Sequence, residues 1–184
     1  MLSYPNLWVP KAIVQGQEPR YSCTLIFAPE TLKTPDYRAL QMAIADVAKA
    51  RFGEKVDFKK LKLPLRQNTE KEGKQGFTDG GTFINPWSKT RCGVVNLKSE
   101  LIIDADEVWP GQLARLSVTP FAYSSGSNIG VSLGLNSVQI LRSAMPRLDG
   151  RTSATEEFSN ASLPAGFETE GGSNSVDEDE EVPF

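Results

Sequence analysis

The segment from Asp149 to Phe184 limits how much of this chain can fold. It is rich in Ser, Gly, Glu, Asn and Thr, and its few apolar residues show no period. Such a segment cannot bury enough apolar surface to offset the entropy lost on ordering. We therefore predict one folded domain over residues 1–148 and a disordered acidic tail over residues 149–184.

Charge divides at the same boundary. Residues 1–148 hold 19 lysines and arginines against 13 acids, whereas residues 149–184 hold one arginine against 10 acids, so the net charge of −3 hides the division. A basic body with an acidic appendage indicates a polyanionic ligand.

The residue types that are missing favour binding over catalysis. The chain has no histidine, the commonest general base and metal ligand. Cys23 and Cys92 stand apart in apolar segments, and we expect buried, reduced thiols, with a disulfide as the alternative. We expect no metal and no cofactor. No apolar run reaches 18 residues and the N-terminus does not resemble a leader, so we expect neither a membrane span nor secretion.

Local patterns predict one clear helix. Thr34 can cap it, Pro35 suits its first turn and Gly53 closes it. Before it, residues 21–27 alternate as a strand with Tyr21, Cys23, Leu25 and Phe27 on one face. Apolar residues recur at helical spacing at Tyr37, Leu40, Ile44, Val47 and Ala48.

Turns and strands fill the rest of the body. Residues 54–80 read as a long, partly irregular loop, and residues 82–97 as two short strands broken near Pro86. Residues 112–123 form the longest strand, followed by a hairpin loop and a return strand with an irregularity at Gly134. We predict a mainly β fold, an OB-fold-like five-stranded Greek-key barrel with one principal helix. An SH3-like barrel or a small sandwich with a helical insert are the alternatives.

The strand 113–123 has two different faces. Its inward face is apolar, and its outward face combines a cation, two hydroxyls and two aromatic rings, which suits bases that stack and phosphates that need positive charge. Alternatively, the rings pack under the long loop or against the helix. The inward residues are Ala114, Leu116, Val118, Pro120 and Ala122, and the outward ones are Arg115, Ser117, Thr119, Phe121 and Tyr123.

Cations interleaved with aromatic residues form a second candidate for nucleic-acid contact. The alternative is that the loop lysines only keep the loop soluble. The cations are Lys55, Lys59, Lys60, Lys62, Arg66, Lys89 and Arg91, and the aromatic residues are Phe58, Phe77, Phe83 and Trp87.

The C-terminal tip is a candidate partner-binding motif, although a purely solubilising tail is the alternative. An apolar end on a charged tether suits a small pocket with a basic rim on another protein. The tip consists of Asp177, Glu178, Asp179, Glu180, Glu181, Val182, Pro183 and Phe184. A separate acidic group, Asp104, Asp106 and Glu107, allows a Mg²⁺-dependent nuclease as a competing hypothesis, but its sequence reads as a strand end entering a turn.

Several ordered blocks resemble a known family. The run GQLARLSVTPFAY, followed by SNIGVSLGLNSVQILR, resembles the central motif of a phage-encoded single-stranded DNA-binding protein family, and YSCTLIFAPE, GTFINPWS and DADEVWPGQ are similar to its other blocks. The resemblance covers residues 4–148. Separately, DEDEEVPF resembles the acidic Pro-Phe tip of bacterial single-stranded DNA-binding proteins.

The resemblance implies an OB-fold, sequence-independent binding of single strands and a tail that recruits replication or recombination proteins. It assigns the DNA face to Arg115, Phe121 and Tyr123, the partner-binding tip to Pro183 and Phe184, and no catalytic residue. We expect action in the host cytoplasm and competition between tail and DNA for the basic surface. Strand annealing and a virion structural role are alternative functions, and a homodimer is one arrangement that the sequence allows.

Overall fold

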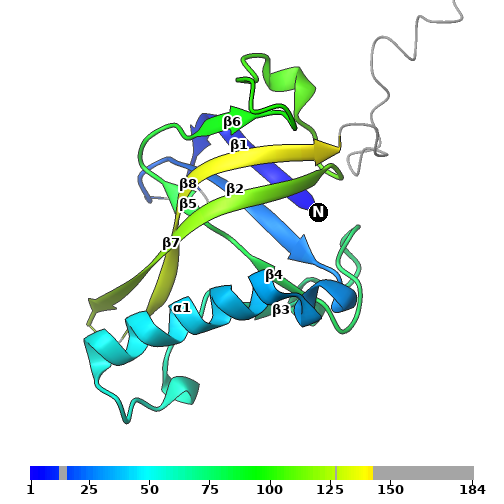
Figure 1. Ribbon diagram of the computed structural model, residues 1–184. Coiled ribbons are helices and arrows are strands. Elements are labelled where there is room, and N and C mark those ends of the chain that lie inside the picture. The colour runs from blue at the N-terminus through cyan, green and yellow to red at the C-terminus, as the bar shows by residue number, and fades with distance from the viewer. Residues whose placement is uncertain (13–15, 127, 143–184) are drawn as a thin grey trace, which may run out of the picture. The chain divides into compact units, whose positions relative to one another are not determined.

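A long antiparallel hairpin organises the fold (Figure 1). The computed structural model describes residues 1–12, 16–126 and 128–142, so the predicted tail and its tip lie outside the described residues. Strands β7 (Leu113–Ser125) and β8 (Asn128–Arg142) pair along their whole length and curve over the helix. The register shifts where Ser117 and Val118 pair with Ser137 and Leu135, which makes a bulge at Asn136. The irregularity that the sequence predicts at Gly134 therefore lies at Asn136, two residues further along β8.

Six shorter strands complete an eight-stranded sheet. The sheet runs in the order β3-β4-β2-β5-β8-β6, while β1 pairs with β2 and β7 pairs with β8. Among the described residues β7 pairs only with β8, so the sheet is open along the outer edge of β7. These strands are β1 (Leu2–Lys11), β2 (Arg20–Phe27), β3 (Arg66–Gln67), β4 (Thr82–Ile84), β5 (Trp87–Ser88) and β6 (Gly93–Val95).

The fold is mainly β with one principal helix, as predicted, but it has more strands than the predicted five. Pro86 has no N–H for a sheet ladder, and it separates β4 from β5. The segment predicted as two strands thus forms three, β4, β5 and β6, and β1 and β3 are additional.

Helix α1 (Pro35–Phe52) has the predicted ends. The backbone N–H of Tyr37 donates to the side-chain oxygen of Thr34 at 3.4 Å, and Gly53 follows the helix with a φ of 95°. Tyr37, Ile44 and Ala48 are buried. No helix in the described part of the chain is long and apolar enough to span a bilayer.

Two hydrophobic clusters form the core. One joins β1, β6 and β8 around Leu2, Val94 and Val138, and includes both cysteines. The other lies under α1, around Ile44, Ile84 and Leu133. Ala114 and Leu116 contact both clusters.

Both cysteines are free and buried, as predicted. Burial raises the pKa of the Cys23 thiol and that of the Cys92 thiol.

The two-faced pattern of β7 is confirmed in its first half. Leu116 and Val118 are half-buried, whereas Arg115, Ser117 and Thr119 are exposed. Strand β2 differs from its prediction, because Ser22 to Ile26 are all buried. This strand is central in the sheet, so residues on both of its faces are covered.

The predicted irregular loop is anchored to the body at both ends. It contains two 3₁₀ helices, η2 (Phe58–Lys60) and η3 (Asn68–Lys71), besides β3. At one end, β3 joins the loop to the body by pairing with β4. Asn68 is buried, and its side-chain amide holds the loop together by donating to the Thr78 carbonyl at 2.9 Å. At the other end, the Lys62 N–H donates to the Ile129 carbonyl and the Val131 N–H donates to the Lys62 carbonyl, each at 3.0 Å.

Candidate nucleic-acid interface

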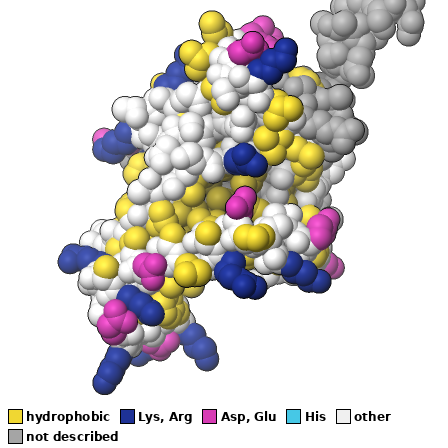
Figure 2. Space-filling model, viewed as in Figure 1, with side chains coloured by type: hydrophobic (Ala, Val, Ile, Leu, Met, Phe, Trp, Pro, Cys, Tyr) yellow, Lys and Arg dark blue, Asp and Glu magenta, His cyan; other side chains and the backbone are white. Residues whose placement is uncertain are grey.

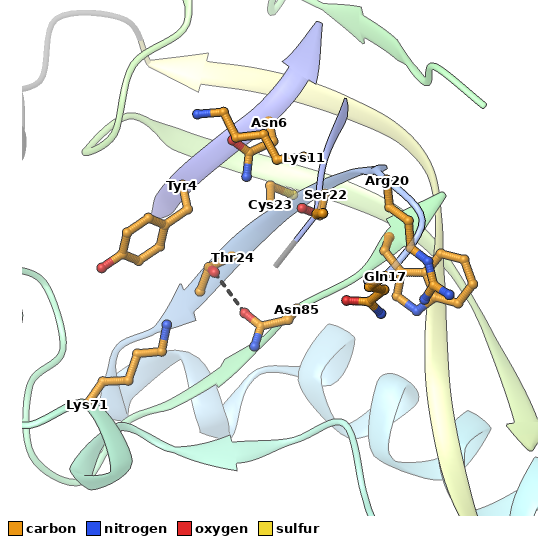
Figure 3. A pocket seen from close by; sticks show the side chains of 12 residues that line it. Tyr4, Asn6, Lys11, Gln17, Arg20, Ser22, Cys23, Thr24, Lys71 and Asn85 are labelled. Carbon is orange, nitrogen blue, oxygen red and sulfur yellow. Dashed lines mark hydrogen bonds between the residues drawn. The ribbon is translucent and has the colours of Figure 1, made fainter. Parts of the chain in front are cut away.

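A polar pocket of about 490 Å³ lies across β1, β2 and β5 (Figure 3). Its deepest polar residues come from β2, where Ser22 is 6% exposed and Thr24 4% exposed. Its cations are more open, since Lys11 is exposed and Arg20 and Lys71 are half-buried. Charge therefore gathers at the rim and neutral hydrogen-bonding groups at the floor. The other residues that line the pocket are Tyr4, Asn6, Ala12, Gln17, Cys23, Asn85 and Trp87.

Tyr4 holds an unusual backbone conformation at one end of the pocket. Its φ is 46°, in the left-handed region that a bulky side chain rarely adopts, and its side chain remains 48% exposed. The pairing of β1 with β2 shifts register between Ser3 and Asn6, on either side of it. Strained residues of this kind persist where the surroundings hold them and cluster at binding sites.

Lys71 lies near three aromatic rings, one of which is that of Tyr4. Its Nζ lies 4.8 Å from the ring centroid of Tyr4, 5.3 Å from that of Phe77 and 5.4 Å from that of Phe83. Burial, followed by the positive charges of Arg66 and Lys74, lowers the pKa of Lys71. An anion bound here would oppose each of these effects, because a negative charge nearby favours the protonated amine.

Arg20 and Trp87 form the opposite end. The Arg20 guanidinium carbon lies 3.8 Å from the Trp87 ring centroid, and the Trp87 and Phe121 rings meet edge to face at 5.8 Å. The Trp87 indole N–H donates to the Ser132 hydroxyl at 3.1 Å, which fixes the ring. Nε of Arg20 is buried and has no hydrogen-bond partner among the residues that the structure describes. A cation stacked on an aromatic ring and short of an acceptor is suited to contact phosphate.

A second depression separates α1 from β7 and is apolar (Figure 2). Figure 2 shows it as a hollow above the helix, walled by hydrophobic side chains. It measures about 650 Å³, and its charged lining residues are Asp36 and Arg115, whose charges oppose each other. Such a surface has no net positive charge to attract a polyanion, so the candidate interface is the polar pocket.

The predicted face of β7 reaches the polar pocket at its far end. Phe121 contacts Trp87, and Tyr123 is half-buried two residues further along. The hydroxyls of Ser117 and Thr119 accept from the Asn136 side-chain amide at 3.4 and 2.9 Å. Arg115 lines the apolar hollow instead. It is six residues from Phe121, about 20 Å along an extended strand.

The predicted loop cations spread over two regions. Lys59 and Lys60 are exposed on η2. Lys62 is exposed as well, and its Nζ donates to the Asn128 side chain at 2.6 Å near the hairpin tip. Arg66 belongs to the pocket region, where its guanidinium pairs with Glu70 and lies 5.1 Å from the Phe83 ring.

Phe83 cannot contact DNA as the sequence predicts. Its side chain is 0% exposed, so a base cannot stack on its ring. The loop carrying Arg66, Lys71 and Phe77 covers it, and the ring supports these residues from beneath.

The cations that follow β5 have partners of their own. Lys89 forms an exposed ion pair with Glu18 at 2.8 Å, and this hydrogen bond and charge lower the pKa of the Glu18 carboxyl. The Arg91 guanidinium lies 5.6 Å from the Trp8 ring.

The acidic group considered for Mg²⁺ has a structural role. The Asp104 carboxylate accepts from the Asp106 N–H at 2.9 Å and caps the 3₁₀ helix η4 (Ala105–Glu107). In the part of the chain that the structure describes, no three side chains of His, Cys, Asp or Glu are grouped to hold a metal ion.

Of the residues that line the pocket, the sequence-based candidates for DNA contact include only Trp87. The missed residues that matter most are Tyr4, Lys11, Arg20, Ser22, Thr24, Lys71 and Asn85. One signal was available, because Arg20, Ser22 and Thr24 alternate as a polar face opposite the apolar face of β2. Nothing in the sequence marks Tyr4, since its conformation depends on how β1 pairs with β2.

Comparisons with known proteins agree on one kind of relative. The family model of the single-stranded DNA-binding protein of Enterobacter phage Enc34 matches residues 1–168, and so extends past the predicted domain boundary. A comparison with curated proteins gives no match.

Solved structures show the same fold. The C-terminally truncated single-stranded DNA-binding protein of bacteriophage Enc34 superposes with a TM-score of 0.66 at 22% identity, over 79% of this chain and 83% of that one. Its complex with single-stranded DNA gives 0.65 at 21% identity, over 79% and 84%. Gp2.5 of bacteriophage T7, a single-stranded DNA-binding protein, gives 0.51 at 14% identity, over 92% and 96%.

These likenesses confirm the predicted fold class as that of phage single-stranded DNA-binding proteins. With a family model that covers nearly all of its length, the chain belongs to the family of the Enterobacter phage Enc34 single-stranded DNA-binding protein.

Proposed function

We propose that this chain binds single-stranded DNA and coats it during phage replication or recombination, with the polar pocket as its principal interface. The observation that carries the proposal is the pair of cation–aromatic contacts at the two ends of the pocket, Lys71 with Tyr4 and Arg20 with Trp87. Family membership supports the same activity.

Each part of the pocket has a role in this proposal. The rings of Tyr4 and Trp87 serve as stacking platforms, and each base–aromatic stack contributes about 1–3 kcal/mol. Lys11, Arg20 and Lys71 contact phosphates, which makes the affinity fall with salt at a slope of roughly −0.7 per contact.

The strand extends beyond the pocket at both ends. At the Trp87 end, Phe121 and Tyr123 of β7 continue the aromatic surface, as the outward face of that strand predicts. At the Tyr4 end, Arg66 continues the positive surface. Arg115 makes at most a peripheral contact in this arrangement, because it lines the apolar hollow.

The acidic segment 149–184 acts as a regulatory and recruiting tail in this proposal. Its carboxylates compete with DNA phosphates for the cations of the body, and Pro183 and Phe184 bind replication or recombination proteins of the infected host cytoplasm. The tether concentrates the carboxylates locally, to the order of millimolar.

Fluorescence titration with oligo-dT over a salt series tests the DNA-binding proposal. Trp87 lines the pocket, so its emission is expected to change on binding. Tyr4→Ala and Arg20→Ala should each weaken binding at least several-fold, and Arg20→Ala should also lower the salt slope.

Gln41→Ala, on the exposed surface of α1, is the matched control and should bind as the wild type does. Absence of binding by the wild-type protein, or equal affinity in all three variants, would contradict the proposal.

A further inference from the structure

We propose that the polar pocket takes one unpaired base edge-first, reads its hydrogen-bonding edge, and prefers thymine over adenine. This inference rests on the proposed function and assigns the pocket floor a role in base selectivity. A surface that only stacks bases and holds phosphates needs no polar floor.

The arrangement of charge separates backbone from base. The cations lie at the rim, where Lys11 is exposed and Arg20 and Lys71 are half-buried. Ser22 and Thr24, which are uncharged, are buried at the floor. A phosphate at the floor would lose its hydration without gaining a cation. The backbone therefore follows the rim, and the base enters the pocket between Tyr4 and Arg20, which Figure 3 shows at its two ends.

The floor presents hydrogen-bond donors. The Thr24 hydroxyl donates to Oδ1 of Asn85 at 2.7 Å, which fixes the amide and leaves its Nδ2 without a partner among the described residues. The Ser22 hydroxyl also has no side-chain partner in that part of the chain and lies on the same strand face as Thr24. Asn85 is half-buried and both residues line the pocket, so these donors are open to a ligand that carries acceptors.

The pairing edges of the bases differ in what they offer such donors. At its pairing edge thymine presents two carbonyl acceptors, O2 and O4, on either side of its N3–H, whereas adenine presents its amino donor and the ring nitrogen N1. Thymine can therefore accept from two donors of the floor, Nδ2 of Asn85 and the Ser22 hydroxyl, whereas adenine can accept from one. A paired base has its edge occupied, so a floor that reads edges also excludes duplex DNA from the pocket.

The experiment compares three ligands of equal length, dT12, dA12 and an abasic 12-mer with the same backbone. Wild-type protein should bind dT12 most tightly and the abasic strand least tightly. Asn85→Ala should reduce the ratio of dT12 to dA12 affinity by about two- to tenfold, the effect of one lost neutral hydrogen bond. Its affinity for the abasic strand should stay within about twofold of the wild type.

The ratio of the two affinities isolates the pocket. Stacking within dA12 also weakens its binding, but that is a property of the DNA and is the same for every protein variant. Gln41→Ala should leave the ratio unchanged. Thr24→Val keeps the side-chain shape, removes the hydroxyl that fixes Asn85 and should lower the ratio as well.

Thermal melting shows whether each variant is folded, and Thr24→Val decides the matter if Asn85→Ala is not. An unchanged ratio, or an equal loss of affinity for all three ligands, would overturn base reading while the DNA-binding function stands. Failure of wild-type protein to bind any ligand would instead reject the proposed function itself.

Discussion

Three residues of the pocket hold conformations or charges that are costly in the free protein. Tyr4 stays at a φ of 46° with an exposed ring, and Lys71 keeps its amine among three rings and two other cations. Arg20 has a buried Nε with no acceptor in the described part of the chain. These features coincide in one pocket of the chain, and a bound phosphodiester relieves the last two because it supplies negative charge and acceptor oxygens.

The lowered pKa of Lys71 predicts a pH dependence of DNA binding. In the free protein, Lys71 loses its proton at a pH below the ordinary lysine pKa of about 10.4. The neutral amine can no longer form an ion pair with phosphate. DNA binding stabilises the protonated form, so the affinity should fall as pH rises through the pKa of Lys71 in the free protein. Lys71→Arg keeps its charge over this range and should remove this part of the decline.

Titrations with oligo-dT between pH 7 and about pH 10 measure the effect, with Lys98→Arg as the control for an exposed lysine outside the pocket. Identical pH profiles for Lys71→Arg and the wild type would show that Lys71 does not contact the DNA.

At the scale of elements, the sequence predicts what is local and misses what depends on pairing. The ends of α1 follow from Thr34 and Gly53, which act within one turn of the helix. The alternation of β7 follows from its own residues, and Phe121 lies on the face of the strand that contacts Trp87. Alternation does not tell where along the strand a ligand lies. The sequence therefore predicts Arg115 on the same surface as Phe121, whereas the structure places Arg115 in the apolar hollow and not in the polar pocket.

The buried position of Phe83 illustrates the same limit. Its ring is covered by the loop around Lys71, whose path depends on Asn68 and on Gly81. A Cβ at Gly81 would lie 2.4 Å from Nδ2 of Asn68 and 2.5 Å from the Phe27 carbonyl oxygen. Contacts between segments so distant in sequence are not encoded in a local pattern.

The contact between the long loop and the β7–β8 hairpin depends on Gly130. A Cβ there would lie 2.2 Å from the Lys62 carbonyl oxygen, which accepts the hydrogen bond from Val131. Gly130→Ala should therefore lower the free energy of unfolding by about 1–3 kcal/mol, the usual effect of overpacking.

Urea denaturation measures this change. Gly93→Ala is the matched control, because its Cβ would meet nothing within 4 Å and its φ is not in the left-handed region, so it should change stability by less than about 0.5 kcal/mol. Equal stability of the two variants would mean that the loop moves away from the hairpin at little cost.

For the whole molecule, the division of charge is the property that sequence alone establishes best. It predicts a polyanionic ligand without any knowledge of the fold, and the pocket between β1, β2 and β5 brings together three cations that would hold such a ligand in the proposed function. The position of that pocket was not predictable, because it joins Tyr4, Lys71 and Asn85 from distant segments.

The same division predicts how the tail affects DNA binding. Removal of residues 177–184 takes away five carboxylates that are tethered to the basic body. Because tethered carboxylates compete with phosphates, the truncated protein should bind oligo-dT more tightly than the full chain at low salt, by about threefold or more. The difference should shrink as salt increases, since screening weakens the competition between exposed charges.

A full-length variant with Asp177, Glu178, Asp179, Glu180 and Glu181 replaced by Asn and Gln separates charge from length. Competition by charge requires this variant to bind as tightly as the truncated protein at low salt. If the neutral tail still weakened binding, chain length or the apolar tip would be responsible. If truncation left the low-salt affinity unchanged, the acidic tail would have no part in controlling DNA binding, and its role would be confined to recruiting partners through Pro183 and Phe184.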